Sequence, residues 1–262
     1  MDFLIKSKRL YFKIEKVLLK PYYVMADIYL RHNNYVFSPS CMRSRFYLPY
    51  VKNDMIQKYI FRWSRYYEQK NLDYICKVWD NGIVGDTIKN TIILDIGANI
   101  GNHTLYYINE CNAMYVYCFE PVKDIFFILC KNMEINNVHN VNLIEAGVGE
   151  HSCMGEISHF DIRNTGGTTI DVSGEGSIKI VSIDELNITD RIGLVKIDVE
   201  GLELSVIKGM MKTLKRDKPF ITIEIRHSYF KDISNLLVAM DYKCVILKNY
   251  KEYSDCLFYS IS

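Results

Sequence analysis

The chain has 262 residues, and its 32 Lys and Arg nearly balance its 31 Asp and Glu, which leaves a formal net charge of +1. Because 49% of the residues are hydrophobic and 24% are charged, the composition excludes a disordered or low-complexity chain and supplies one sizeable core. No apolar run approaches the ~20 residues of a membrane span, and the first residues lack a signal-peptide pattern, so the sequence predicts a cytoplasmic protein.

The positive charge is concentrated at the N-terminus, where residues 1–70 hold 14 Lys and Arg against 5 Asp and Glu. Residues 1–20 form an amphipathic basic pattern, with Leu10, Ile14 and Val17 on one helical face. Such a helix suits an anionic membrane surface, and a helix packed on the core with a solvated face fits equally. We therefore predict a basic helical extension over residues 1–50. Peripheral membrane contact through residues 1–20 and homodimerisation through the extension are hypotheses.

A second helix is expected over residues 54–79, and it carries a cluster of aromatic side chains. Trp63, Tyr66 and Tyr67 precede Glu68 there, just upstream of the most informative stretch of the chain. One acid among aromatic rings can hold the charged amino end of a ligand. An ordinary helix face fits the same residues.

The chain is organised around a strand, a tight turn and a helix N-terminus over residues 91–103. An apolar run ends at Asp95, and a loop with Gly97, Asn99 and Gly101 then opens into a helix. A dinucleotide fingerprint would read G-x-G-x-x-G with a later acidic residue, whereas this loop reads D-x-G-x-N-x-G. The alternative interpretations are a turn used only for packing and a nucleotide site of another kind.

A further carboxylate, Glu120, follows the next predicted strand, Tyr115 to Phe119. Two carboxylates without a phosphate-binding lysine suit a cationic, phosphate-free ligand that carries an amino group and a ribose diol. S-adenosylmethionine (SAM) has this chemistry, and we predict it as the ligand of the loop.

Strands and helices alternate over the rest of the chain, which predicts a largely parallel sheet with right-handed crossovers. A glycine-rich insertion at about 148–178 interrupts the alternation, and we expect a hairpin or mobile loop beside the site. The last two strands are joined by a loop too short for a crossover helix, so we expect them to pair antiparallel. The expected strands are 141–146, 194–198, 220–225, 243–247 and 257–261, and the expected helices are 122–136, 204–214 and 233–240.

Three segments at matching separations resemble one known family. They are D-I-G-A-N-I-G-N-H at residues 95–103, F-E-P at 119–121 and K-I-D-V-E-G-L-E at 196–203. Together they are similar to the FkbM family of SAM-dependent methyltransferases, over roughly residues 45–224. The resemblance implies a class I methyltransferase domain over residues 51–262, an α/β Rossmann-like fold whose seven-stranded, mostly parallel sheet has an antiparallel last strand. It also implies methylation of hydroxyl oxygens on sugars, glycans such as surface polysaccharides, or secondary metabolites.

By the same resemblance, a set of residues is expected to bind SAM. Gly97 and Gly101 are expected to line the turn, and Asp95 and Asn99 to position the methionine portion. Glu120 is expected to hold the ribose hydroxyls, and Glu145 or Ala146 to border the adenine. Glu68 is expected to reach the amino group. Asp198 and Glu200 are expected where the acceptor and the methyl donor meet.

Several questions of mechanism stay open at this level. A sugar hydroxyl needs a base, and His227, Asp198 and Glu200 are the first candidates. His159 and Asp161 in the insertion are further ones. A Mg²⁺ ion held by Asp198 and a second carboxylate is the metal-assisted alternative. The basic N-terminus raises a nucleic-acid (ribose 2′-O) methyltransferase as a rival, although no N-P-P-Y segment and no RNA-binding module is present. A SAM-binding scaffold without turnover is the rival from another class.

Overall fold

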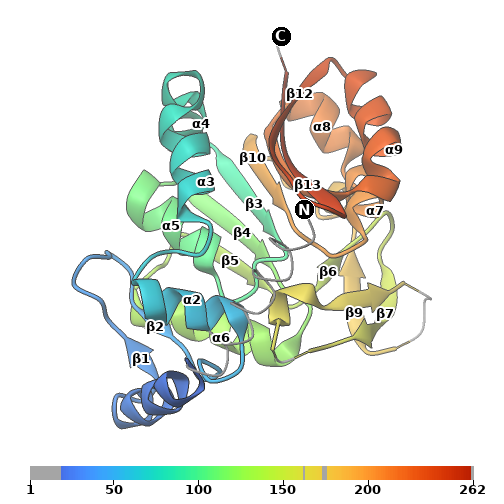
Figure 1. Ribbon diagram of the computed structural model, residues 1–262. Coiled ribbons are helices and arrows are strands. Elements are labelled where there is room, and N and C mark those ends of the chain that lie inside the picture. The colour runs from blue at the N-terminus through green and yellow to red at the C-terminus, as the bar shows by residue number, and fades with distance from the viewer. Residues whose placement is uncertain (1–18, 162, 173–175, 261–262) are drawn as a thin grey trace, which may run out of the picture.

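The computed structural model describes residues 19–161, 163–172 and 176–260. A seven-stranded sheet forms its centre, and Figure 1 shows how the helices surround it. The strands lie in the order β12-β13-β11-β10-β3-β4-β5. Their bounds are β3 Ile92–Ile96, β4 Tyr115–Phe119, β5 Val141–Ile144, β10 Ile192–Ile197, β11 Phe220–Arg226, β12 Tyr242–Asn249 and β13 Tyr253–Ser260. β13 pairs antiparallel with both of its neighbours and the other interior pairs are parallel, which confirms the predicted fold class.

Helices cover both faces of this sheet. Every residue of β3 and β10 is buried, as expected for central parallel strands enclosed on two sides. One face packs against helices α4, α5 and α6, and the other against α7, α8 and α9. The bounds are α4 Ile83–Ile88, α5 Asn102–Cys111, α6 Lys123–Ile135, α7 Glu203–Lys208, α8 Met211–Asp217 and α9 His227–Val238.

On the face covered by α7, α8 and α9, two helices have other bounds than the sequence predicted. The expected helix over 204–214 is split into α7 and α8, with Gly209 between them, where an added Cβ would lie 2.0 Å from the carbonyl oxygen of Gly149. α9 begins at His227, six residues before the predicted start. His227 follows directly on Arg226, the last residue of β11, so no separate loop joins the strand to the helix.

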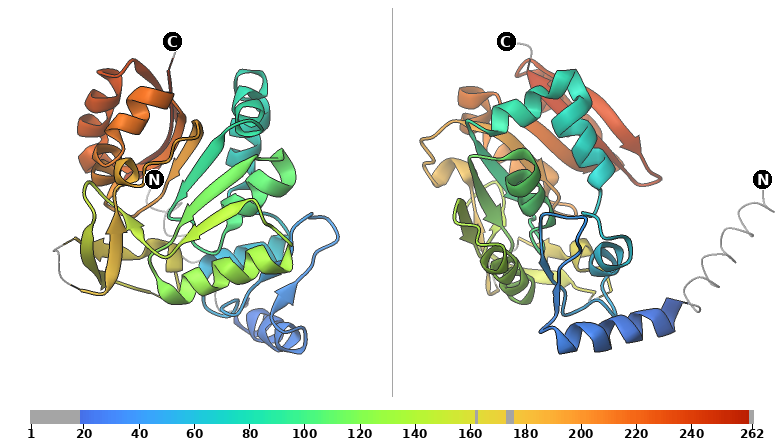
Figure 2. Two further views of the ribbon diagram at one scale, coloured as in Figure 1. Left: turned by 180° about the vertical axis from the view of Figure 1, so that it is seen from behind. Right: turned by 90° about the vertical axis from the view of Figure 1, so that its left-hand side faces the viewer.

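The N-terminal part contains a helix over residues 19–32, which lies at the periphery of the molecule (Figure 2). The predicted helix over residues 1–20 falls almost entirely outside the described residues. After the helix, β1 (Val36–Phe37) and β2 (Phe46–Tyr47) pair antiparallel. The backbone N–H of Tyr47 donates to the side chain of Asn132 on α6 (2.6 Å), whose amide in turn donates to the carbonyl of Ile100 (2.7 Å). This buried asparagine therefore joins the extension to the glycine-containing loop.

The prediction of a single helix over residues 54–79 is wrong. The segment breaks into α2 (Met55–Trp63), α3 (Gln69–Asp73), a π-helical turn η1 (Tyr74–Val78) and a 3₁₀ turn η2 (Trp79–Gly82). α2 ends because Ser64 adopts a left-handed conformation, and Glu68 is left-handed as well (φ 58°). The aromatic cluster therefore lies on a loop between two helices rather than on one helix face.

The glycine-rich insertion forms a second, small sheet with strand order β6-β9-β7-β8. The strands are β6 Gly147–Val148, β7 Cys153–His159, β8 Thr169–Asp171 and β9 Ile178–Val181. β7 and β8 pair antiparallel, which confirms the hairpin, and a short 3₁₀ turn η3 (Thr165–Gly167) precedes β8. This sheet lies beside the carboxyl ends of β3 and β4 (Figure 1).

Candidate active site

The loop after β3 packs tightly against the end of β10. Gly97 has a φ of 77°, and an added Cβ would lie 1.9 Å from the carbonyl oxygen of Asp198, so only glycine fits. Asn99 is also left-handed (φ 50°), and its side-chain oxygen accepts from the N–H of Ile100 (2.7 Å). These contacts fix the turn that the sequence predicted.

Asp95 lies beneath the loop rather than in the pocket. Its side chain has no exposed surface, and the hydroxyl of Thr104 donates to it (2.6 Å). The parallel register places Lys196 of β10 directly beside it, with Lys196 Nζ 3.5 Å from a carboxylate oxygen of Asp95. Lys196 also donates to the carbonyl of Gly97 (2.6 Å) and lies 3.5 Å from Asp198. Asp95 and Lys196 thus form a buried charge pair that supports the loop.

Glu120, at the tip of β4, holds the loop from the other side. Its two carboxylate oxygens accept from the backbone N–H of Asn99 (3.0 Å) and of Val122 (2.9 Å). Burial raises the pKa of Glu120 to about 7, and these two backbone donors oppose the shift. A buried carboxylate with lone pairs to spare at a strand tip suits the hydroxyls of a ribose.

A pocket of about 810 Å³, including its open mouth, lies above this loop. The predicted cofactor residues Gly97, Asn99, Glu120, Ala146 and Asp198 line it, and so does the predicted catalytic residue Glu200. The insertion supplies part of the opposite wall, chiefly from η3 and β8. The lining residues from the second sheet, from η3 and from the residue that joins them are Gly147, Val148, Thr165, Gly166, Thr168 and Ile170.

Glu68 and His103 border the adjoining space on the side of Lys196. His103 Nε2 lies 3.7 Å from a carboxylate oxygen of Glu68. Burial lowers the pKa of His103 to about 3, so its imidazole is neutral at physiological pH. Burial, and then repulsion by Asp198 and Asp255, raise the pKa of Glu68 to about 7. Glu68 is therefore near the site, but it does not line the pocket above the loop.

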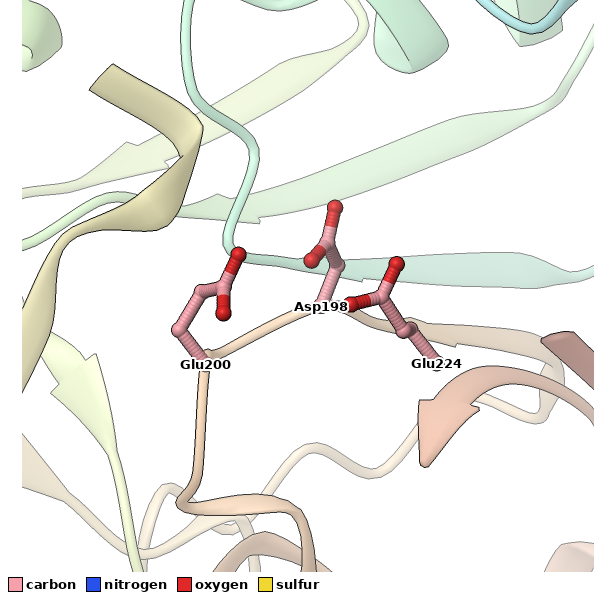
Figure 3. Close-up of side chains that lie close together, drawn as sticks. All are labelled: Asp198, Glu200 and Glu224. Carbon is pink, nitrogen blue, oxygen red and sulfur yellow. The ribbon is translucent and has the colours of Figure 1, made fainter. Parts of the chain in front are cut away.

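Three carboxylates converge where β10 and β11 end. Asp198, Glu200 and Glu224 each offer an oxygen within 4.8 Å of the others (Figure 3). Burial and repulsion by Asp198 and Glu200 raise the pKa of Glu224 to about 9, so this group carries a proton at neutral pH. Glu200 accepts from Arg226 (3.1 Å), while Asp198 faces Lys196. The cluster therefore combines a carboxylic acid with two carboxylates that have cationic partners.

Three predicted site residues lie elsewhere. His227, at the start of α9, is exposed and does not line the pocket, and its Nε2 lies 3.2 Å from both Asn249 and Ser254. Glu145 is exposed and does not line the pocket, so of the predicted adenine neighbours only Ala146 does. Gly101 caps α5 with a φ of 82° and faces Leu129 and Met133 of α6.

Sequence reasoning missed one buried residue that frames the pocket. Asp54 caps α2 through the N–H of Gln57 (2.8 Å), and its other oxygen accepts from the N–H (3.1 Å) and the hydroxyl (2.9 Å) of Thr165. The hydroxyl of Thr165 in turn accepts from the side chain of Asn99 (3.4 Å). An N-cap aspartate before a helix was recognisable, but its partner lies 111 residues away.

Comparison with known proteins decides the family. The family model described as the methyltransferase FkbM domain matches residues 95–244, more than half of the chain. The chain belongs to the FkbM methyltransferase family. The resemblance inferred from the three sequence segments is thereby confirmed.

Among curated relatives, hexuronic acid methyltransferase AglP of Haloferax volcanii is 34% identical over 155 residues, covering 57% of this chain and 62% of that protein. Methyltransferase sdnD of Sordaria araneosa is 26% identical over 157 residues, covering 46% of this chain and 61% of that protein. The chain spans about three fifths of the length of these relatives. The crystal structure of the FkbM methyltransferase of Methylobacillus flagellatus KT shares the fold, with a TM-score of 0.52 and 20% identity over 65% of this chain and 44% of that one.

No helix within the described part of the chain is long and apolar enough to cross a membrane.

Proposed function

We propose that this chain is a SAM-dependent O-methyltransferase that methylates a hydroxyl of a saccharide. The observation that carries the proposal is the continuity between the pocket above the loop, where Glu120 lies, and the cluster of Asp198, Glu200 and Glu224. The relative that methylates a hexuronic acid supports a saccharide acceptor. A secondary-metabolite hydroxyl is the alternative within the same chemistry.

The residues of the pocket fit SAM. Glu120 offers a buried acceptor for a ribose diol, and Ala146 and Val148 offer an apolar wall for an adenine ring. Asp198 and Glu200 supply negative charge near the place of a sulfonium. Bound SAM supplies an electrophilic methyl group, whose bond to sulfur breaks as a bond to the acceptor oxygen forms.

The chain's own part is to align the acceptor and to take its proton. We assign the proton to Asp198, because this carboxylate borders the pocket and both spaces that adjoin it. Lys196 Nζ lies 3.5 Å from a carboxylate oxygen of Asp198 and holds this side chain in place. Burial and the neighbouring carboxylates raise the pKa of Glu224, which favours the protonated form that can donate a hydrogen bond, while Glu200 is paired with Arg226.

Mg²⁺ assistance has a geometric basis in the same three carboxylates. However, Asp198 and Glu200 already have cationic partners in Lys196 and Arg226, which offset the charge that would attract an ion. We therefore assign the chemistry to the side chains. An assay with added Mg²⁺ or with chelator tests this assignment, because loss of turnover in chelator would give the ion a role.

Peripheral membrane contact is proposed for the N-terminal part. The helix over residues 19–32 exposes a stripe of large apolar side chains: Tyr22, Met25, Ile28 and Tyr29 are 40%, 64%, 44% and 55% exposed. Ala26 and Leu30 of the same helix are buried. The stripe adjoins a sequence rich in lysine, and this combination suits an anionic lipid surface.

Calorimetric titration with SAM and with S-adenosylhomocysteine tests the core of the proposal. We expect binding in the micromolar range by the wild type and its loss in Glu120→Ala. Glu134→Ala, which removes an exposed carboxylate of α6, is the matched control and should bind as the wild type does. A folded wild type that binds neither compound would overturn the proposal. Binding without transfer to any acceptor would favour the scaffold alternative.

A further inference from the structure

A second cavity adjoins the SAM pocket, and we call it the acceptor cavity. It measures about 950 Å³ including its mouth, and it shares Ile56, Tyr67, Gly166, Asp198 and Glu200 with the pocket. Its remaining lining residues are Met55, Glu68, Asn164, Glu224, Arg226, Glu252 and Tyr253. A molecule in this cavity has direct access to the place where methyl transfer is proposed.

Acidic side chains greatly outnumber basic ones among the described lining residues of the acceptor cavity. Five carboxyl side chains line it: Glu68, Asp198, Glu200, Glu224 and Glu252. Arg226 is the one cationic side chain among the described lining residues, and Glu200 already accepts from it at 3.1 Å. Lys196 lies behind Asp198 and is shared with Asp95. Among the lining residues that the structure describes, no cation is therefore left over for an anionic group on the acceptor.

The raised pKa values at the cavity have the same origin. Glu224 and Glu68 hold their protons more tightly because burial and neighbouring carboxylates disfavour another negative charge. An acceptor carboxylate or phosphate would meet the same repulsion and would also lose its hydration. Hydroxyl groups, in contrast, can donate to the carboxyl oxygens that line the cavity.

Aromatic rings complete the wall at the mouth. Tyr253 lines the cavity, and its ring stacks on that of Tyr250 with centroids 4.4 Å apart and an interplanar angle of 26°. Tyr67 lines the cavity as well. An aromatic face beside hydrogen-bond acceptors suits a sugar ring, whose C–H groups cover the ring while its hydroxyls reach the carboxylates.

We infer that the acceptor is a saccharide unit without negative charge, either a neutral or an amino sugar, and that hexuronic acids and phosphate-bearing acceptors, including nucleic acids, are rejected. The inference rests on the proposed function. It sets this chain apart from the relative whose name specifies a hexuronic acid.

The test uses matched methyl glycosides that differ at one group: the hexoside, the amino-hexoside and the hexuronide, each in the gluco, galacto and manno configurations. Binding to the full chain saturated with S-adenosylhomocysteine is measured by ligand-observed NMR, and turnover is measured with SAM. In at least one configuration we expect the hexoside or amino-hexoside to bind at least about tenfold more tightly than its hexuronide, a difference typical of an unpaired charge at a site of like sign.

Equal or tighter binding of the hexuronides, or no binding of any glycoside by protein that binds S-adenosylhomocysteine, would overturn the inference and leave the proposed function standing. Failure to bind S-adenosylhomocysteine would instead contradict the proposed function.

A charge reversal at the mouth of the acceptor cavity tests whether electrostatic repulsion causes the preference against hexuronides. Glu252 is exposed and lines the cavity, so Glu252→Lys should reduce the preference against the hexuronide several-fold, and more at low salt. Glu134→Lys makes the same charge change on α6, outside the cavity, and should leave the preference unchanged. An equal preference in Glu252→Lys and the wild type would overturn the electrostatic argument.

Discussion

One carboxylate oxygen of Asp54 accepts two hydrogen bonds from Thr165, one from its backbone N–H (3.1 Å) and one from its hydroxyl (2.9 Å). Asp54 has no exposed surface, and Thr165 is nearly as deeply buried. The contact joins the start of α2 to η3 of the insertion, and η3 lines the pocket that we propose for SAM. One side of the pocket is therefore held in place by a residue that does not line it.

Asp54→Ala is expected to destabilise the fold and to weaken SAM binding. It removes an N-cap worth ~1 kcal/mol and leaves the buried N–H and hydroxyl of Thr165 without their acceptor, so the free energy of unfolding should fall by about 2–4 kcal/mol. Chemical denaturation and calorimetric titration measure the two effects. Thr165→Val keeps the cap and should lose less stability. Wild-type SAM affinity in Asp54→Ala would show that the contact stabilises the fold without shaping the pocket.

The free energy of unfolding should decrease as the pH rises from about 4.5 to about 7, the interval between the unfolded and folded pKa values of Glu120. The pKa of Glu120 is raised from 4.5 to about 7 by burial, so between these values the folded protein keeps a proton that the unfolded chain releases. The free energy of unfolding therefore decreases with rising pH in that window. Glu68, with its pKa also raised to about 7, acts in the same direction.

Melting temperatures of the ligand-free protein between pH 5 and 8 measure this dependence. Glu120→Gln cannot titrate, so it should flatten the slope. SAM affinity should move the other way and rise with pH, because the charged form of Glu120 is the better acceptor for ribose hydroxyls. A Glu120→Gln slope as steep as the wild type's would assign the effect to other carboxyl groups.

Asp198→Asn should lower the rate of methyl transfer by about 10²–10⁴-fold, the usual contribution of a general base. The amide keeps the size of the side chain, so S-adenosylhomocysteine binding should change far less than turnover. Single-turnover kinetics and calorimetry separate the two quantities. His227→Gln tests the base that lies outside the pocket, and a loss of the same size there, with Asp198→Asn still active, would assign the proton to the histidine.

The parts of the site that follow from local sequence were predictable. The order of apolar strand, glycine turn and helix over residues 91–103 fixes the loop, and strand-tip carboxylates such as Glu120 and Asp198 fall at one edge of a parallel sheet. The antiparallel pairing of β12 and β13 followed from their short connection. These inferences need only periodicity, turn chemistry and strand direction.

The parts that depend on distant contacts were not predictable in the same way. The apolar pattern over residues 54–79 continues past Ser64, although the backbone turns there into the left-handed region. The partner of Asp54 comes from an insertion whose strands could not be paired from sequence. His227 was a candidate base because it follows a strand, but α9 begins at that residue and its ring lies beside Asn249 and Ser254.

Lys196→Met is expected to cost more stability than most core substitutions. It would leave the fully buried Asp95 without its cation, and breaking a buried pair from one side typically costs 3–5 kcal/mol, so a loss of about that size is predicted. Adding Asp95→Asn to Lys196→Met removes the unpaired buried charge and should restore part of the lost stability. A double-mutant cycle in urea measures the coupling. Additive effects would contradict the pairing.

Removing residues 1–18 should abolish binding to anionic vesicles, with little effect on SAM affinity. The basic side chains of this segment are each worth ~1 kcal/mol near an anionic surface, and the apolar stripe on residues 19–32 would enter the lipid interface. Met25→Glu, at the most exposed position of the stripe, should weaken binding in the full chain. Sedimentation with phosphatidylserine vesicles, with neutral vesicles as the control, measures it. Unchanged binding in both variants would contradict membrane contact, and a dimer that both variants dissociate in light scattering would assign the stripe to self-association.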